Sequence, residues 1–223
     1  MAKSMKRGLC LLLFLVFLFL PATAPRSAAT PQLPAEFYYR ALITSGEFSQ
    51  EIQHYQSGEF IRHVVTTPGF SPSVTIFRPD LAVIWIYDEG GAEYSASPYD
   101  PRLIPEIFAL ELVESSSIKR QNLGHERILD YNTTKIRITD PSMPEWEVYI
   151  WNASKLGGMT LKKLERVTNN GKIVSELLVE VKEIKINPIP PEYFQLPPGM
   201  TLVEGLSPKA IEWDEDFLPD IHY

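Results

Sequence analysis

Cysteine is almost absent from this chain of 223 residues. The single cysteine, Cys10, lies within an apolar run near the N-terminus. The residues after that run therefore contain no disulfide, no catalytic thiol and no cysteine-ligated metal. Stability has to come from a hydrophobic core, for which a chain of this length with 44% hydrophobic residues has enough material.

Long hydrophobic runs are also scarce, and the one that exists is too short to span a membrane comfortably. It covers residues 8–20 and is stopped by Pro21. Basic residues before it and small residues after it, at Ser27 and Ala29, predict a secretory signal peptide cleaved after about Ala29. An uncleaved anchor is the alternative, which the short run disfavours. Because Cys10 lies at the start of the run, a lipid anchor on cysteine is not expected.

Positive charge is in deficit. Removal of residues 1–29 takes away four of the 21 basic residues and none of the 28 acidic ones, which leaves 17 basic residues and a net charge of −11. A chain this acidic is a poor binder of nucleic acid, and anionic membrane surfaces repel it. We therefore expect no nucleic-acid partner.

The usual catalytic motifs are missing. There is no G-x-S-x-G sequence, and Gly90-Gly91 and Gly157-Gly158 are turn glycines that do not open a helix. His54 and His63 could face each other across a hairpin, but no carboxylates at fixed spacing complete a metal site. We interpret both as surface or strand-edge histidines. The sequence thus predicts no enzyme activity, no metal and no cofactor.

What the chain does contain is a series of strand patterns separated by turn residues. Tight turns require neighbouring strands to pair antiparallel, as in a meander. An interior glycine, Gly46, predicts a bend within its strand, and Asn170-Gly171 predicts a type I′ hairpin turn. A change of phase near Lys182 predicts a β-bulge. The predicted strands are 42–52, 58–66, 74–77, 82–88, 92–96, 124–129, 134–139, 145–151, 161–168 and 173–186.

The strand 82–88 is apolar on both faces and must be covered on both sides. We predict that a helix within 101–114 covers one face, with Pro105 near its first turn. The proline-rich segment 188–198 cannot be a central strand. It is predicted to close the sheet edge with its two aromatic residues docked, followed by an acidic tail.

Three short motifs, in this order, carry a family resemblance. They are Phe77-Arg78-Pro79-Asp80 followed by Trp85, then Gly124-His125-Glu126, then Phe194-Gln195-Leu196-Pro197-Pro198-Gly199. Over roughly residues 40–203 the chain resembles the superfamily of the periplasmic outer-membrane lipoprotein carriers LolA and LolB, in an uncharacterised secreted branch. The resemblance implies a mainly β fold with few helices. Its expected form is a curled antiparallel sheet or incomplete β-barrel covered by helix. The implied domains are a signal peptide (1–29), the half-barrel (30–204) and an acidic tail (205–223).

The resemblance also implies a periplasmic protein with an apolar cavity for a lipid or a lipoprotein acyl chain. A protein-binding sensor or envelope assembly factor is the alternative. On strand 145–151, Trp146 shares one face with Val148, whereas Tyr149 and Trp151 share the other, so only one of these sets can line a cavity. A filled core is the competing interpretation for every aromatic residue. The ligand-binding candidates are Phe77, Trp85, Tyr87, Trp146, Tyr149 and Trp151.

Overall fold

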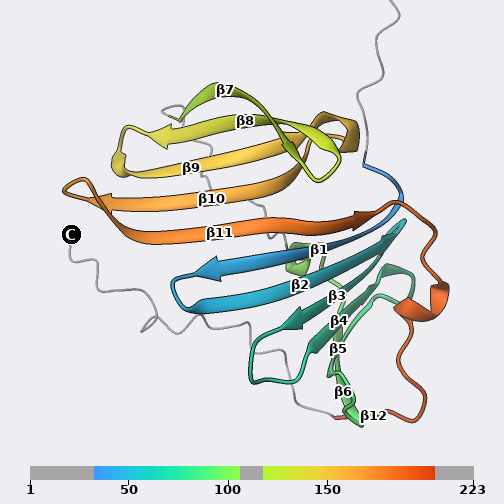
Figure 1. The fold of residues 1–223 in the computed structure, drawn as a ribbon. Helices are drawn as coiled ribbons and strands as arrows, with labels where there is room; N and C mark the ends of the chain where they lie inside the picture. The colour runs from blue at the N-terminus through green and yellow to red at the C-terminus, as the bar shows by residue number, and fades with distance from the viewer. Residues whose placement is uncertain (1–32, 106–117, 204–223) are drawn as a thin grey trace, which may run out of the picture. The chain divides into compact units, whose positions relative to one another are not determined.

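A computed structural model describes residues 33–105 and 118–203, which form one open sheet of twelve strands (Figure 1). The strand order is β12-β6-β5-β4-β3-β2-β1-β11-β10-β9-β8-β7, so β12 and β7 lie at the two ends of the sheet. Every neighbouring pair is antiparallel except β12 with β6, which is parallel. The predicted signal peptide and acidic tail lie outside the described residues.

The strands are joined mostly by tight turns, which confirms the predicted antiparallel meander. Their bounds are β1 Glu36–Ser45, β2 Phe48–Ser57, β3 Phe60–Thr66, β4 Ser73–Arg78, β5 Val83–Asp88, β6 Glu93–Pro98, β7 Lys119–Ile128, β8 Tyr131–Asp140, β9 Met143–Ala153, β10 Met159–Asn169, β11 Lys172–Lys185 and β12 Thr201–Leu202. Four short 3-10 helices complete the described residues: η1 Pro79–Leu81, η2 Pro101–Leu103, η3 Ser154–Leu156 and η4 Pro191–Phe194.

Local turn chemistry explains where the hairpins form. Asn170 and Gly171 both have positive φ (51° and 74°), as the predicted type I′ turn requires. The prediction for Gly46 was wrong, because this glycine (φ 56°) makes the turn between β1 and β2 and does not bend a single strand. The predicted bulge in β11 is confirmed, since Arg40 pairs with Glu183 and Ala41 with Val181, which leaves Lys182 as the extra residue.

The two faces of the sheet differ, and the pairing register shows which residues share a face. Phe37, Ile61, Phe77 and Ile84 align across β1 to β5. We call the face that carries them the apolar face. On the other half of the sheet the same face carries Ile136, Ile138, Val148, Ile150, Val179 and Val181.

Only short segments of the described residues pack on the apolar face. Ile104, directly after η2, packs with Tyr99 against the cluster of Ile61, Phe77 and Ile84. The predicted helix 101–114 is described only over its first five residues. There it is the 3-10 helix η2 and not an α-helix, and residues 106–117 lie outside the described part. A helical cover over the sheet is therefore not seen in the described residues.

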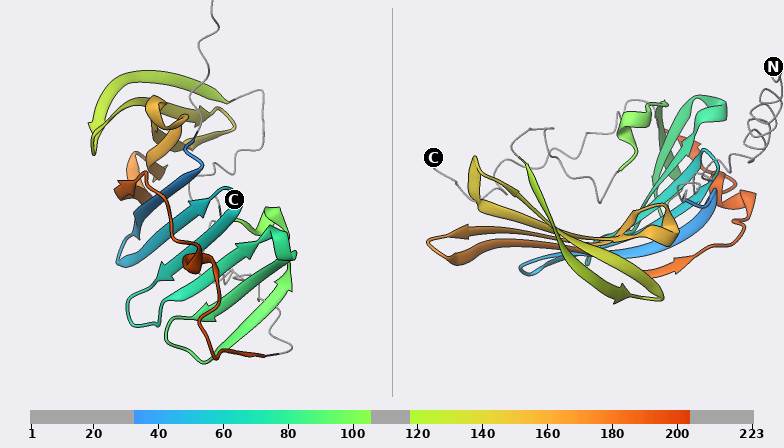
Figure 2. Two further views of the ribbon diagram at one scale, coloured as in Figure 1. Left: turned by 90° about the vertical axis from the view of Figure 1, so that its right-hand side faces the viewer. Right: turned by 90° about the horizontal axis from the view of Figure 1, so that it is seen from above.

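The opposite face of β2 to β5 is covered by residues 188–200, which we call the strap (Figure 2). Phe194 of the strap is 2% exposed and packs in a cluster with Val64 and Val74. Arg78 fixes it, because Nη1 donates to the Phe194 carbonyl (2.9 Å) while Nε and Nη2 pair with Asp80. The strap was predicted to close the sheet edge. Instead it lies on a face, and β12, which follows the strap, pairs with β6 at the end of the sheet.

Candidate functional site

The six predicted ligand-binding residues do not share one face. Phe77 and Trp146 lie on the apolar face, by the register of β4 with β5 and of β9 with β10. The four other predicted residues lie on the opposite face: Trp85, Tyr87, Tyr149 and Trp151. The structure therefore divides the candidates into two sets that cannot contact one small ligand together. On β9 it shows the same division that alternation predicts for Trp146 against Tyr149 and Trp151.

Trp151 already has partners on the opposite face. Its indole Nε1 donates to Glu126 Oε2 at 2.7 Å, and the ammonium groups of Lys135 and Lys162 lie 4.8 Å and 5.1 Å from its ring centroid. Lys135 also lies 5.7 Å from the ring of Tyr149. Such cation–π and hydrogen-bond contacts satisfy the polar and aromatic surfaces of both residues. The hydrogen bond to Glu126 and the two ammonium groups thus account for the contacts of Trp151 on this side of β9.

Trp85 and Tyr87 are occupied in a different way, by the strap. Both belong to the cluster that Phe194 and Leu196 complete. The guanidinium of Arg78 lies 5.6 Å from the Trp85 ring centroid. Burial raises the pKa of the Tyr87 hydroxyl, since its charged form would lose solvation. These two residues thus hold the strap on the sheet.

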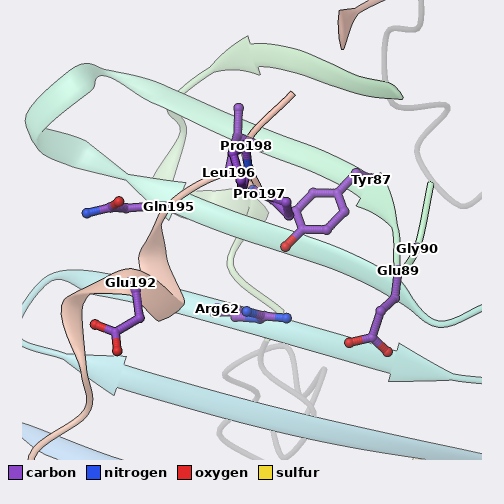
Figure 3. A pocket seen from close by; sticks show the side chains of 9 residues that line it. All are labelled: Arg62, Tyr87, Glu89, Gly90, Glu192, Gln195, Leu196, Pro197 and Pro198. Carbon is purple, nitrogen blue, oxygen red and sulfur yellow. The ribbon is translucent and has the colours of Figure 1, made fainter. Parts of the chain in front are cut away.

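A shallow pocket of ≈ 280 Å³ lies between the strap and the C-terminal end of β5. Figure 3 shows Arg62, Tyr87, Glu89 and Glu192 around it. The Arg62 guanidinium lies 6.0 Å from the ring of Tyr55 and 5.7 Å from that of the strap residue Tyr193. Its Nη1 also donates to the Tyr193 carbonyl, at 3.4 Å. These contacts make Arg62 a clamp for the strap. The two glutamates give the pocket a net negative charge, which does not favour an anionic ligand.

The apolar face carries a buried histidine pair. His54 on β2 and His63 on β3 are direct register partners, as the sequence predicts, and His54 Nδ1 lies 2.8 Å from His63 Nε2. The prediction that they are surface or strand-edge histidines was wrong, because they are 6% and 1% exposed. The ring of Tyr39 stacks on His54 at 4.7 Å, and the ring of Phe77 meets His63 edge-on at 6.1 Å.

Burial keeps both imidazoles neutral at physiological pH. Loss of solvation lowers the pKa of His54 to about 4, against a smaller opposing effect of its hydrogen bond to Gln56. Burial and the neighbouring His54 lower the pKa of His63 to about 3. The sequence does contain a signal for this placement. His54 lies two positions after Ile52, so on a strand both side chains point to the same face, and both are buried. A histidine in such phase can be read as an apolar-face residue.

A second polar group lies on the apolar face, beside Trp146. The Trp146 indole Nε1 donates to Glu165 Oε1 at 2.9 Å, and the Lys163 ammonium lies 3.4 Å from Glu165 Oε2. Lys163 is only 8% exposed. The apolar face therefore combines extended hydrocarbon surface with two localised polar positions, as ligand sites for amphipathic molecules do.

Metal chemistry finds no support in the described ranges. Within residues 33–105 and 118–203, no three histidine, cysteine or acidic side chains are grouped so that they could hold a metal ion. In the same ranges, no helix has the length and apolar composition that crossing a membrane requires.

No protein-family model matches the sequence, and the search of curated proteins finds no match. Solved structures with a similar fold include an uncharacterized conserved protein from Thermus thermophilus, with 14% identity over 77% of this chain and 91% of the other, and a TM-score of 0.48. They also include MucB in complex with MucA(peri), with 12% identity, 75% and 56% coverage, and a TM-score of 0.45. The chain thus spans a little more than half of MucB.

A LolA superfamily protein from Nitrosomonas europaea is also similar, with 11% identity over 74% of this chain and 93% of the other, and a TM-score of 0.34. The structural neighbours thus include the superfamily that the sequence motifs resemble. At these identities and TM-scores, neither a ligand nor a partner for this chain follows from the likenesses.

Proposed function

We propose that the protein is exported to the periplasm and binds a lipid, or an apolar ligand such as a lipoprotein acyl chain, on the apolar face of its sheet. The observation that carries the proposal is the difference between the two faces. The clusters on the apolar face, from β8 across to β5, consist of buried hydrocarbon side chains, whereas the opposite face is covered by the strap or by ion pairs. In a single sheet, an apolar face of this extent needs a cover, and a ligand with a long hydrocarbon chain can contribute to one.

The ligand-binding residues that we propose are Phe77 and Trp146, together with the aliphatic residues aligned with them on the apolar face. The four other aromatic candidates lie on the opposite face, against the strap or beside charged side chains, and are assigned to structure. The predicted signal peptide supports the location, and the extent of aliphatic surface on the apolar face supports a ligand that is mainly hydrocarbon.

Native mass spectrometry of protein purified from its own host, without detergent, tests this function. We expect a heavier species that loses mass after extraction with organic solvent, and recovery of a lipid in the extract. A Val148→Asp variant places a charge in the middle of the apolar face and should retain less lipid. An Ile76→Asp variant is the matched control for folding, because Ile76 is equally buried, on the opposite face. Wild-type protein that carries no lipid, and takes up none when vesicles are added, would count against the proposal.

A protein-binding function is the second candidate, and it rests on the edge strand β7. Within residues 33–105 and 118–203 this strand pairs only with β8, and eight of its ten residues are exposed. An exposed edge offers unpaired backbone groups to an added strand. The acidic tail is the second expected contact for a partner, so deletion of residues 206–223 distinguishes the two functions. Loss of a partner in a pull-down with unchanged lipid content would favour protein binding over lipid carriage.

A further inference from the structure

The orientation of one side-chain amide fixes the protonation pattern of the histidine pair. Gln56 Nε2 donates to the Gly58 carbonyl at 3.1 Å, which leaves Gln56 Oε1 as the atom 3.3 Å from His54 Nε2. An amide oxygen accepts only, so His54 Nε2 must carry a proton. Because His54 is neutral, its Nδ1 then carries a lone pair.

The same reasoning continues to the second ring. His54 Nδ1 is an acceptor, so the contact of 2.8 Å requires that His63 Nε2 is the donor. His63 is also neutral, and its remaining nitrogen, Nδ1, therefore carries a lone pair. The tautomers of both rings follow from one glutamine on the same strand as His54.

This last acceptor has no partner among the described residues. His63 Nδ1 is buried there without a hydrogen bond, in a side chain that is 1% exposed. An unsatisfied buried polar atom is costly, and native proteins seldom retain one without a role. Phe77 lies edge-on to the His63 ring, and Ile61 and Val65 share its face on β3. The apolar face thus contains one directed hydrogen-bond acceptor within hydrocarbon surroundings.

We propose that His63 Nδ1 accepts a hydrogen bond from an O–H group at the polar end of the apolar ligand. This inference rests on the proposed function and specifies the chemistry of its ligand, which carries a neutral hydroxyl or protonated carboxyl group. An ionised phosphodiester or carboxylate has no proton to donate. Two neutral imidazoles also supply no positive charge to such an anion, so burying it there would be expensive.

A matched pair of probes tests the proposal in the full chain. 1-Dodecanol and its methyl ether have the same hydrocarbon chain, but only the alcohol donates a hydrogen bond. Both are delivered as cyclodextrin complexes, and binding is followed by the fluorescence of a variant that keeps Trp146 as its one tryptophan (W85F/W151F/W213F). We expect the alcohol to bind about tenfold more tightly than the ether, as one buried hydrogen bond predicts. His63→Phe should abolish this preference, so that the alcohol and the ether bind with equal affinity.

Imidazole nitrogen NMR of the wild-type chain tests the proposed hydrogen bond even if the His63→Phe variant fails to fold. The resonance of unprotonated His63 Nδ1 should shift when dodecanol is added and remain in place with the ether. Equal binding of both probes, or a resonance that responds to neither while both bind, would overturn the role of His63 and leave the lipid-binding function standing. If neither probe binds, and dodecanoic acid and phospholipid vesicles do not bind either, the proposed function itself fails.

Discussion

Acid should destabilise this protein well above the pH at which its carboxylates titrate, and the histidine pair is the cause. In the unfolded chain both imidazoles have a pKa near 6.5, whereas burial lowers the folded values to about 4 and about 3. Below pH 6.5 the unfolded chain therefore binds more protons than the folded protein. The stability that the neutral pair provides is complete above pH 6.5 and is lost as the pH falls towards the folded pKa values.

The magnitude follows from the linkage relation. Each unit of pH between the unfolded and folded pKa values costs about 1.4 kcal/mol per histidine. From pH 6.5 to pH 5 this amounts to about 2 kcal/mol for each ring, so we expect a loss of about 3–4 kcal/mol for the pair between pH 7 and pH 5. Such a loss is a large part of the free energy of unfolding of a typical domain.

Urea denaturation followed by tryptophan fluorescence at pH 7 and pH 5 measures this loss. The matched control is the double variant H54F/H63F, in which phenylalanine keeps an aromatic ring beside Tyr39 and Phe77 and the exposed His125 remains. The variant should lose less than about 1 kcal/mol over the same range. Equal losses in wild type and variant, or a wild type whose stability does not change with pH, would refute the reasoning.

Four further substitutions test the strap, a turn and the opposite face of β9. Phe194→Ala should lower the free energy of unfolding by about 3–5 kcal/mol in urea denaturation, because it leaves a cavity between the strap and the sheet. Tyr193→Ala, at a residue that is 37% exposed, should lower it by about 1 kcal/mol. Equal effects would show that the strap does not pack as described. Gly171→Ala should raise the cost of the positive φ at the β10–β11 turn by about 1 kcal/mol, measured as a lower melting temperature. Glu126→Gln should weaken the contact with Lys135 and shift the Trp151 emission; an unchanged spectrum would argue against the Trp151–Glu126 hydrogen bond.

The strands were predictable where local chemistry decides the outcome. Asn170-Gly171 permits positive φ at two successive residues, so its hairpin follows from two residues alone. The bulge at Lys182 is visible as a change of phase in a period-two pattern. Gly46 was misread because a glycine within an apolar pattern suits both a bend and a two-residue turn, and only the pairing of β1 with β2 decides between them.

The candidate site was only partly predictable, because it depends on contacts between distant segments. Alternation separates Trp146 from Trp151 on β9, but it does not say which face is apolar. Which face is left to the ligand depends on the strap, residues 188–200. The strap covers Trp85 on the opposite face, although it lies more than a hundred residues further along the chain. The burial of His54 and His63 likewise depends on aromatic residues of β1 and β4, which the local sequence of β2 and β3 does not contain.

Quenching by a brominated fatty alcohol tests the central claim most directly, since quenching requires contact between the lipid and the indole. Two single-tryptophan variants are compared: one keeps Trp146, on the apolar face, and the other keeps Trp151, on the opposite face. Lipid bound to the apolar face should quench Trp146 strongly and leave Trp151, held between Lys135 and Lys162, nearly unchanged. Equal quenching of both, or quenching of Trp151 alone, would contradict a ligand on the apolar face.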